Sequence, residues 1–189
     1  MNINEIKKIR IGDEFYPEKL LHIYAPPQEL YVLGDASILN EKGIAIIGCR
    51  DCSDYGKKVS YYFAKELANK NINIISGLAR GIDAIAHKGA IDVKGKTIGV
   101  LGCGLDVVYP PENKELYKQI IKSGGAIITE YPLGTKPLKH NFPARNRIIS
   151  GLSDGVLVIE AKKKSGTLNT ASHALDQGKD VFVIPRRYF

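Results

Sequence analysis

The sequence contains no tryptophan, one methionine and three cysteines among its 189 residues. The cysteines, Cys49, Cys52 and Cys103, are an odd number and form no repeated pair of metal ligands, so neither a disulfide framework nor a metal site is expected. No uncharged apolar run approaches the roughly 18 residues of a membrane-spanning helix. Residues 1–10 mix acidic and basic side chains and lack the apolar core of a secretory signal. We therefore expect a protein of the reducing cytoplasm with no membrane segment and no cofactor.

Cys49 and Cys52 have the Cys-x-x-Cys spacing of thioredoxin-like redox sites and directly follow an expected strand. Small side chains at these positions also suit a tight turn around a phosphate group. The sequence favours the phosphate turn and leaves a redox role open.

Basic residues outnumber acidic ones, with 27 Lys plus Arg against 20 Asp plus Glu and a formal net charge of +7. A positive field attracts polyanions such as nucleic acid or an acidic membrane surface, and charge alone does not choose between them. The apolar fraction of 44% is enough for the chain to bury one sizeable core.

From residue 44 onward, short runs rich in Ile and Val alternate with longer amphipathic stretches. Nearly continuous apolar runs are typical of parallel strands that are covered by helices on both faces. Segments 54–69 and 112–122 are long enough for crossover helices, and Val59, Phe63 and Leu67 would form the inward stripe of the first. The sequence predicts an α/β, Rossmann-like fold with a doubly wound, mainly parallel sheet. The expected strands are Ile44–Gly48, Ile72–Ile75, Thr97–Leu101, Ala126–Thr129, Val156–Glu160 and Val181–Ile184.

Residues 1–40 lack this alternation and are expected to form an N-terminal extension packed on the core, whereas residues 41–189 form the Rossmann-like domain. Glycines follow most of the expected strand ends, Gly48 and Gly77 among them. In open α/β sheets, ligands bind outside the carboxyl ends of the strands, where loop amides and helix N-termini converge. We therefore expect the functional site at this edge.

Two glycine turns follow the first two of these strands. After Gly48-Cys49, Arg50 could make a bidentate contact with phosphate, which lysine would make less well. In the second turn, which starts at Gly77, Asp83 and His87 lie four residues apart on one helical face. They could form an acid–base pair, half of a metal site or a local hydrogen bond, and we favour a capping Asp83 and a packed His87.

Two basic segments follow later in the chain. Residues 136–147 combine four cationic side chains, Lys139 among them, with His140 and Phe142, and single-stranded nucleic acid favours cations beside an aromatic surface. Arg145 and Arg147 cannot share a helical face, so one should face the ligand while the other pairs internally. The second segment offers lysines, hydroxyls and amides at a helix start, namely Lys162, Lys163, Lys164, Ser165, Gly166 and Thr167.

Five short motifs, taken in order, resemble the DprA (Smf) family of DNA-processing proteins over about residues 16–185. They are Gly48-Cys49-Arg50, Ser76-Gly77-Leu78-Ala79-Arg80-Gly81-Ile82-Asp83, Tyr109-Pro110, Phe142-Pro143-Ala144-Arg145-Asn146-Arg147 and Ser165-Gly166-Thr167. The resemblance implies an extended Rossmann fold that dimerises, binds single-stranded DNA, protects incoming strands and helps to load the recombinase RecA in natural transformation.

By the same resemblance, Arg50 and Lys139 hold DNA phosphate, and Phe142, Arg145, Asn146 and Arg147 lie at or near the same pocket. Cys49 stands where the family usually has serine, which leaves the amide geometry intact but weakens the side-chain donor. The sequence ends at Phe189 without the segment that often completes the family's Rossmann domain and without the small helical domains of many members. We therefore expect DNA binding through the core alone, and the expectation of a homodimer is weaker.

The alternative is a nucleotide-binding or nucleotide-hydrolysing enzyme of the lysine-decarboxylase-like phosphoribohydrolase type. In an alignment on Gly166-Thr167, the catalytic glutamate of those enzymes is replaced by Thr170, which cannot act as a general base. Glu130 and Glu160 lie at strand ends and could substitute for it. A dinucleotide-binding enzyme is disfavoured because no Gly-x-Gly-x-x-Gly motif opens a helix. We therefore expect no catalytic residues.

Overall fold

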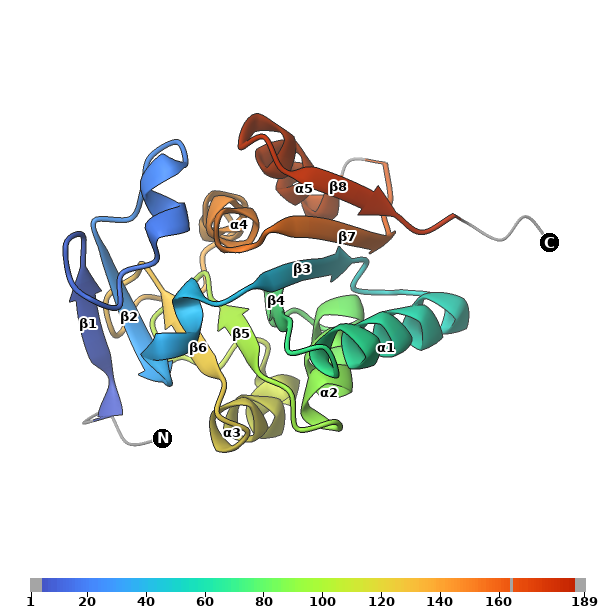
Figure 1. Cartoon of the computed structure of the whole chain (residues 1–189), viewed down its shortest axis with the longest axis horizontal. Helices are drawn as coiled ribbons and strands as arrows, with labels where there is room; N and C mark the ends of the chain where they lie inside the picture. Colours follow the sequence, from blue (N-terminus) through green and yellow to red (C-terminus); the bar gives the residue numbers. More distant parts are fainter. Residues whose placement is uncertain (1–4, 164, 186–189) are drawn as a thin grey trace.

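A computed structural model describes residues 5–163 and 165–185. Its centre is one eight-stranded sheet with the order β1-β2-β6-β5-β4-β3-β7-β8 (Figure 1). The strands are β1 (Lys7–Arg10), β2 (Glu29–Gly34), β3 (Gly43–Gly48), β4 (Asn73–Ser76), β5 (Thr97–Val100), β6 (Ala126–Thr129), β7 (Gly155–Glu160) and β8 (Asp180–Val183). Strands β3 to β8 pair in parallel and correspond to the six expected runs, so the Rossmann-like fold is confirmed.

Helices cover both faces of the sheet. Helices α1 (Asp54–Ala68), α2 (Ile82–Ile91) and α3 (Lys114–Lys122) pack on one face, and α4 (Asn141–Leu152) and α5 (Gly166–Asp176) pack on the other (Figure 1). Short 3-10 helices η2 (Glu18–His22) and η3 (Ala36–Asn40) join the second group, and η4 (Pro111–Asn113) precedes α3. No helix within the described ranges is long and apolar enough to cross a membrane.

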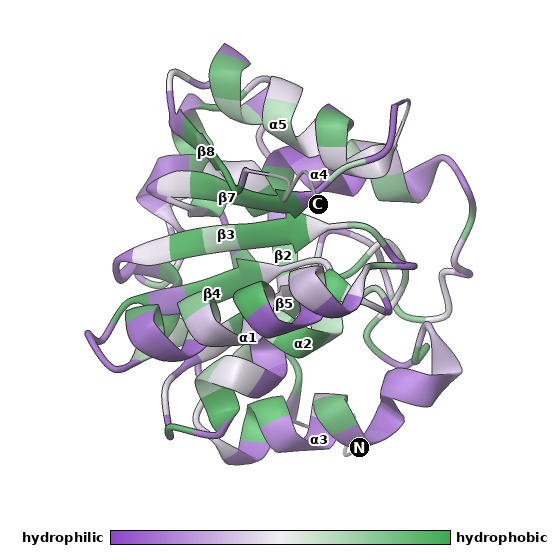
Figure 2. Ribbon diagram, turned by 90° about the vertical axis from the view of Figure 1, so that its right-hand side faces the viewer, coloured by the Kyte–Doolittle hydropathy of each residue, from purple (hydrophilic) through white to green (hydrophobic). Residues whose placement is uncertain are grey.

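Alternating residues of the strands supply the two halves of the core, as the side-chain period of a strand requires. On β3, Ala45 and Ile47 face α4, whereas Ile46 faces α1 and α2. The central strands are accordingly apolar along most of their length (Figure 2). The burial on both faces explains why these strands read as continuous apolar runs in the sequence.

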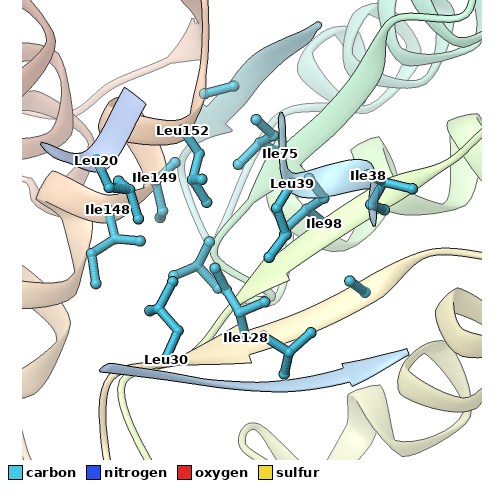
Figure 3. Packing of buried hydrophobic residues seen from close by; sticks show 14 of the residues in the cluster. Leu20, Leu30, Ile38, Leu39, Ile75, Ile98, Ile128, Ile148, Ile149 and Leu152 are labelled. Carbon is cyan, nitrogen blue, oxygen red and sulfur yellow. The ribbon is translucent and has the colours of Figure 1, made fainter. Parts of the chain in front are cut away.

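The N-terminal segment is a structural part of this sheet, which differs from the extension expected to pack on the outside. Strand β2 pairs antiparallel with β6, and β1 pairs antiparallel with β2. Side chains from residues 20–39 complete the core beside α4, as Figure 3 shows for Leu20, Leu30, Ile38 and Leu39. Antiparallel strands need no crossover helix, so this segment lacks the strand–helix rhythm found later in the chain.

Helix α1 packs through small side chains rather than through the stripe expected from its large ones. Its buried residues recur at four-residue spacing and are Gly56, Ser60, Ala64 and Ala68. The predicted stripe of Val59, Phe63 and Leu67 is half-buried at the margin of the same core. The reason is the neighbouring α2, where a Cβ on Gly89 would lie 2.9 Å from that of Ala64. Such a close approach leaves room only for small residues.

The strand order creates a switch point between β3 and β7. From β3 the chain moves through β4 and β5 to β6, and then returns to place β7 and β8 on the opposite side of β3. Loops that leave β3 and β7 therefore diverge to opposite faces of the sheet and open a crevice at the carboxyl ends of the strands.

Candidate nucleic-acid interface

A cleft of about 670 Å³ occupies the carboxyl edge of the sheet at this switch point. Loops after β3 and β7 and the N-terminal ends of α4 and α5 supply its walls. Ten of the predicted site residues line it: Gly48, Cys49, Arg50, Lys139, Phe142, Arg145, Asn146, Ser165, Gly166 and Thr167. Gly77 lines a smaller pocket beside it, and Lys164 lies outside the described residues.

The loop after β3 is fixed by its neighbours on both sides. The Cys49 amide donates to the carbonyl of Glu160 at 2.9 Å, and the Cys49 carbonyl accepts from the amide of Ile82 at 3.3 Å. Gly48 packs against Ile82 so closely that a Cβ would lie 2.6 Å from its side chain. The backbone is therefore rigid while the Arg50 side chain remains exposed at the cleft.

Helix α5 directs its N-terminus at the same cleft. Gly166 and Thr167 are its first residues, and the first amides of a helix have no partner within the helix. Together with the helix dipole they favour an anion such as a phosphate group. Exposed Lys162 lines the cleft beside them, so the side chain belongs to the interface although the sequence identified it only as part of a cationic rim.

Aromatic side chains lie among the cations. Phe142, in the first turn of α4, is tilted by 37° against Tyr109 with 5.4 Å between ring centroids. The Arg50 guanidinium carbon lies 6.0 Å from the centroid of the Phe142 ring. Sequence reasoning left Tyr109 out of the site, although the Tyr109-Pro110 motif carried part of the family resemblance.

Arg145 is buried and serves mainly to hold the site together. Its guanidinium donates to the carbonyls of Gly77, at 2.9 Å, and Val100, and its Nε donates to the side-chain oxygen of Asn146. Burial lowers the pKa of Arg145 from its usual value. Asn146 in turn donates to the Gly166 carbonyl at 3.2 Å, so these two residues connect α4 to both neighbouring loops.

Arg147 differs from the prediction that made it a phosphate ligand. Its guanidinium forms two hydrogen bonds with the Glu130 carboxylate, at 2.7 and 2.6 Å, and its Nε donates to the carbonyl of Ala25. The side chain therefore points away from the cleft toward the N-terminal segment. Of the two arginines, Arg147 forms the internal ion pair, and Arg145 is the one that reaches the cleft wall.

Asp83 and His87 are separated by their surroundings. The Asp83 carboxylate accepts from the amides of Gly77 and Ala79 at 3.2 and 3.4 Å, and burial raises the pKa of Asp83 to about 6. His87 Nδ1 lies 2.6 Å from Thr97 Oγ1 inside the core, where burial lowers the pKa of His87 to about 3. The structural interpretation of both residues is confirmed. In the described part of the chain, no three acidic, His or Cys side chains are grouped to hold a metal ion.

The carboxylates that could have supported hydrolysis are engaged elsewhere. Glu130 is held by Arg147, and Glu160 accepts from the amide of Ser53 at 2.9 Å. Thr170 lines the cleft where a ribohydrolase needs glutamate, and its hydroxyl donates to the Gly166 carbonyl. All three cysteines are free thiols, and burial raises the pKa of Cys52, which is opposite to the shift of a reactive thiolate.

Comparison with known proteins identifies the family. The family described as "DNA recombination-mediator protein A" matches residues 7–189. The chain belongs to this family. Protein Smf of Escherichia coli, a family relative, is 47% identical over 177 residues, which cover 94% of this chain and 47% of that protein.

Two solved structures of DNA processing protein A resemble the chain over nearly its full length. The structure from Streptococcus pneumoniae superposes with a TM-score of 0.91 at 43% identity and covers 98% of this chain and 65% of the other. A structure from Helicobacter pylori, described in terms of its single-stranded DNA binding mode, has a TM-score of 0.89 at 34% identity and covers 97% of this chain and 82% of the other. This chain thus spans about half the length of the E. coli family member and about two thirds of the S. pneumoniae chain.

Proposed function

We propose that the chain binds single-stranded DNA in this cleft and acts as a recombination mediator. The observation that carries the proposal is the convergence of Arg50, Lys139 and the N-terminus of α5 on one cleft at the carboxyl edge of the sheet. These groups suit successive phosphates of one strand, since they combine side-chain cations with unpaired helix amides. The single-stranded DNA binding described for the H. pylori relative supports the same ligand.

The aromatic surface favours single-stranded over duplex DNA. Phe142 and Tyr109 lie between the cations, where unstacked bases could reach them, and such contacts tolerate any sequence. No protruding helix in the described part of the chain is suited to enter a major groove. The proposed preference is therefore for single strands with little base selectivity.

The wider role follows from family membership. We propose that the chain protects incoming single strands, helps to load RecA during natural transformation, forms a homodimer and works in the cytoplasm. It is not an enzyme in this proposal, because Glu130 and Glu160 are both engaged and Thr170 replaces the base of the ribohydrolases. Faster assembly of RecA on strands already coated with a single-strand-binding protein would support the mediator role.

The salt dependence of binding tests the DNA site. Arg50→Ala and Lys139→Ala should each weaken binding to all sequences alike and reduce the slope of log affinity against log salt by about 0.7, because one phosphate contact is lost. Fluorescence anisotropy with a labelled oligothymidine at several salt concentrations measures both quantities. Lys118→Ala is the matched control, since Lys118 is an exposed lysine of α3 that pairs with Glu115 and does not line the cleft.

Arg50→Lys separates charge from geometry at the same position. It keeps the positive charge but loses the bidentate fork, so affinity should fall only partway. Unchanged slopes in both alanine variants, on protein with wild-type melting temperature, would remove these residues from the DNA site. Equal or tighter binding to duplex DNA would contradict the proposed preference for single strands.

A further inference from the structure

A second, smaller pocket of about 230 Å³ opens beside the cleft. It lies between the loop after β4 and the loop that leads into η4, and Arg50 and Phe142 line both spaces. We propose that this pocket receives one nucleobase of the strand whose phosphates occupy the cleft. The inference rests on the proposed function and adds to it a site for a base, with Tyr109 as the residue that stacks on it.

The shape of the pocket suits a single flat ring. Its volume is below the roughly 300–1,000 Å³ of pockets that hold drug-sized ligands. Tyr109, Pro110 and Pro111 form one side of it, and Leu78 and Ala79 contribute to the other. A planar, largely apolar slot of this size fits a base better than it fits a chain of sugar and phosphate.

Tyr109 is held at its backbone while its ring remains accessible. Its carbonyl accepts a hydrogen bond from the hydroxyl of buried Tyr117 at 3.0 Å, whereas the residue as a whole is 36% exposed. The tilted contact with Phe142 fixes one edge of the ring. The residue therefore presents an aromatic surface on a fixed backbone, as stacking platforms for single strands require.

The charges of the two spaces differ in the way that a nucleotide requires. The cleft is lined by Arg50, Lys139 and Lys162, which attract phosphate. The small pocket is lined by Glu112, whose carboxylate disfavours a phosphate and can accept from the ring or exocyclic N–H groups of a base. Arg50 stands at the boundary, so a phosphate held there would place its own base at the entrance of the pocket.

The test compares Tyr109→Ala with Tyr109→Phe on two probes of equal length. One probe is oligothymidine, and the other is an abasic oligonucleotide with the same number of phosphates. Tyr109→Ala should lose about fivefold or more in affinity for oligothymidine, should bind the abasic strand as the wild type does, and should keep the wild-type salt slope. Tyr109→Phe keeps the aromatic face and should retain wild-type affinity for both probes.

The outcomes separate this inference from the proposed function. Failure of the wild type to bind either probe would overturn DNA binding itself. Normal wild-type binding with an unchanged affinity of Tyr109→Ala for oligothymidine would overturn the base site alone. An equal loss on both probes would also overturn it, because a lost stacking contact cannot weaken binding to a strand without bases. A melting temperature for each variant shows that the folded protein was compared.

Discussion

At the scale of single residues, Arg147 illustrates how an arginine from a DNA-binding motif serves the fold. The Arg147 and Glu130 side chains are 13% and 19% exposed and share two short hydrogen bonds. Arg147→Ala would leave Glu130 largely buried without its partner, so we expect a loss of roughly 3 kcal/mol in unfolding free energy. Denaturant titration measures this loss, and the salt slope of DNA binding by the folded variant should be unchanged. Stability like that of the wild type together with a reduced slope would instead return Arg147 to the DNA site.

His87 makes stability depend on pH through its burial. Its pKa is about 3 in the folded chain against an ordinary value of 6.5, so the folded protein resists protonation and the unfolded chain accepts it. Stability from this residue is complete above pH 6.5 and is lost as the pH falls toward 3, by up to about 1.4 kcal/mol per pH unit. Asp83, with its raised pKa, acts in the opposite direction between its ordinary value and about 6.

The variant His87→Asn isolates the histidine contribution. It removes the titrating ring and can still donate to Thr97, so the difference in stability between pH 7 and pH 4.5 should be more favourable to the variant at acid pH than in the wild type. Asp83 is present in both proteins and cancels from the comparison. Parallel stability curves across this range, from denaturant titrations at each pH, would rule out His87 as a source of acid sensitivity.

At the scale of elements, the join between β4 and α2 depends on one glycine. Gly81 has φ +80°, and a Cβ there would lie 2.3 Å from the carbonyl oxygen of Arg50. Gly178 also has a positive φ, +68°, but a Cβ there would meet nothing within 4 Å. Gly178→Ala should therefore cost about 1 kcal/mol from backbone strain alone. Gly81→Ala should cost several times more and should also weaken DNA binding, because the Arg50 loop must move.

Thermal unfolding and oligothymidine affinity measure both effects on the two glycine variants. Similar losses of stability in both would mean that the contact between Gly81 and the Arg50 loop carries no energy. The element-scale conclusion is that α2 and the phosphate loop are positioned as one unit by backbone contact rather than by side chains.

At the scale of the whole molecule, the N-terminal segment should be needed for folding. Deletion of residues 1–40 removes Leu20, Leu30, Ile38 and Leu39, which are at most 1% exposed, and uncovers the edge of β6. We expect the remaining fragment to show no cooperative thermal transition, since it loses a large part of its core and gains an unpaired strand edge. A soluble fragment with a sharp transition, measured by circular dichroism, would instead support an independent domain from residue 41.

The sequence by itself determined the local features of this protein. Strands β3 to β8 could be located because burial on both faces demands continuous apolar runs, and such runs are visible without knowledge of their neighbours. The glycine turns and cations at the strand ends could be assigned to one edge, since parallel strands bring all their carboxyl ends together. Most of the candidate site followed from that rule.

Only the tertiary structure decided the features that depend on distant partners. The sequence separates Arg145 from Arg147 on the helix but cannot orient α4, and the choice was made by Glu130 and by Ala25, which lies 122 residues away. The pairing of β2 with β6 and the small-residue contact of α1 with α2 have the same cause. A side chain's local pattern states which faces it can occupy, whereas the contacts that fill each face come from segments far along the chain.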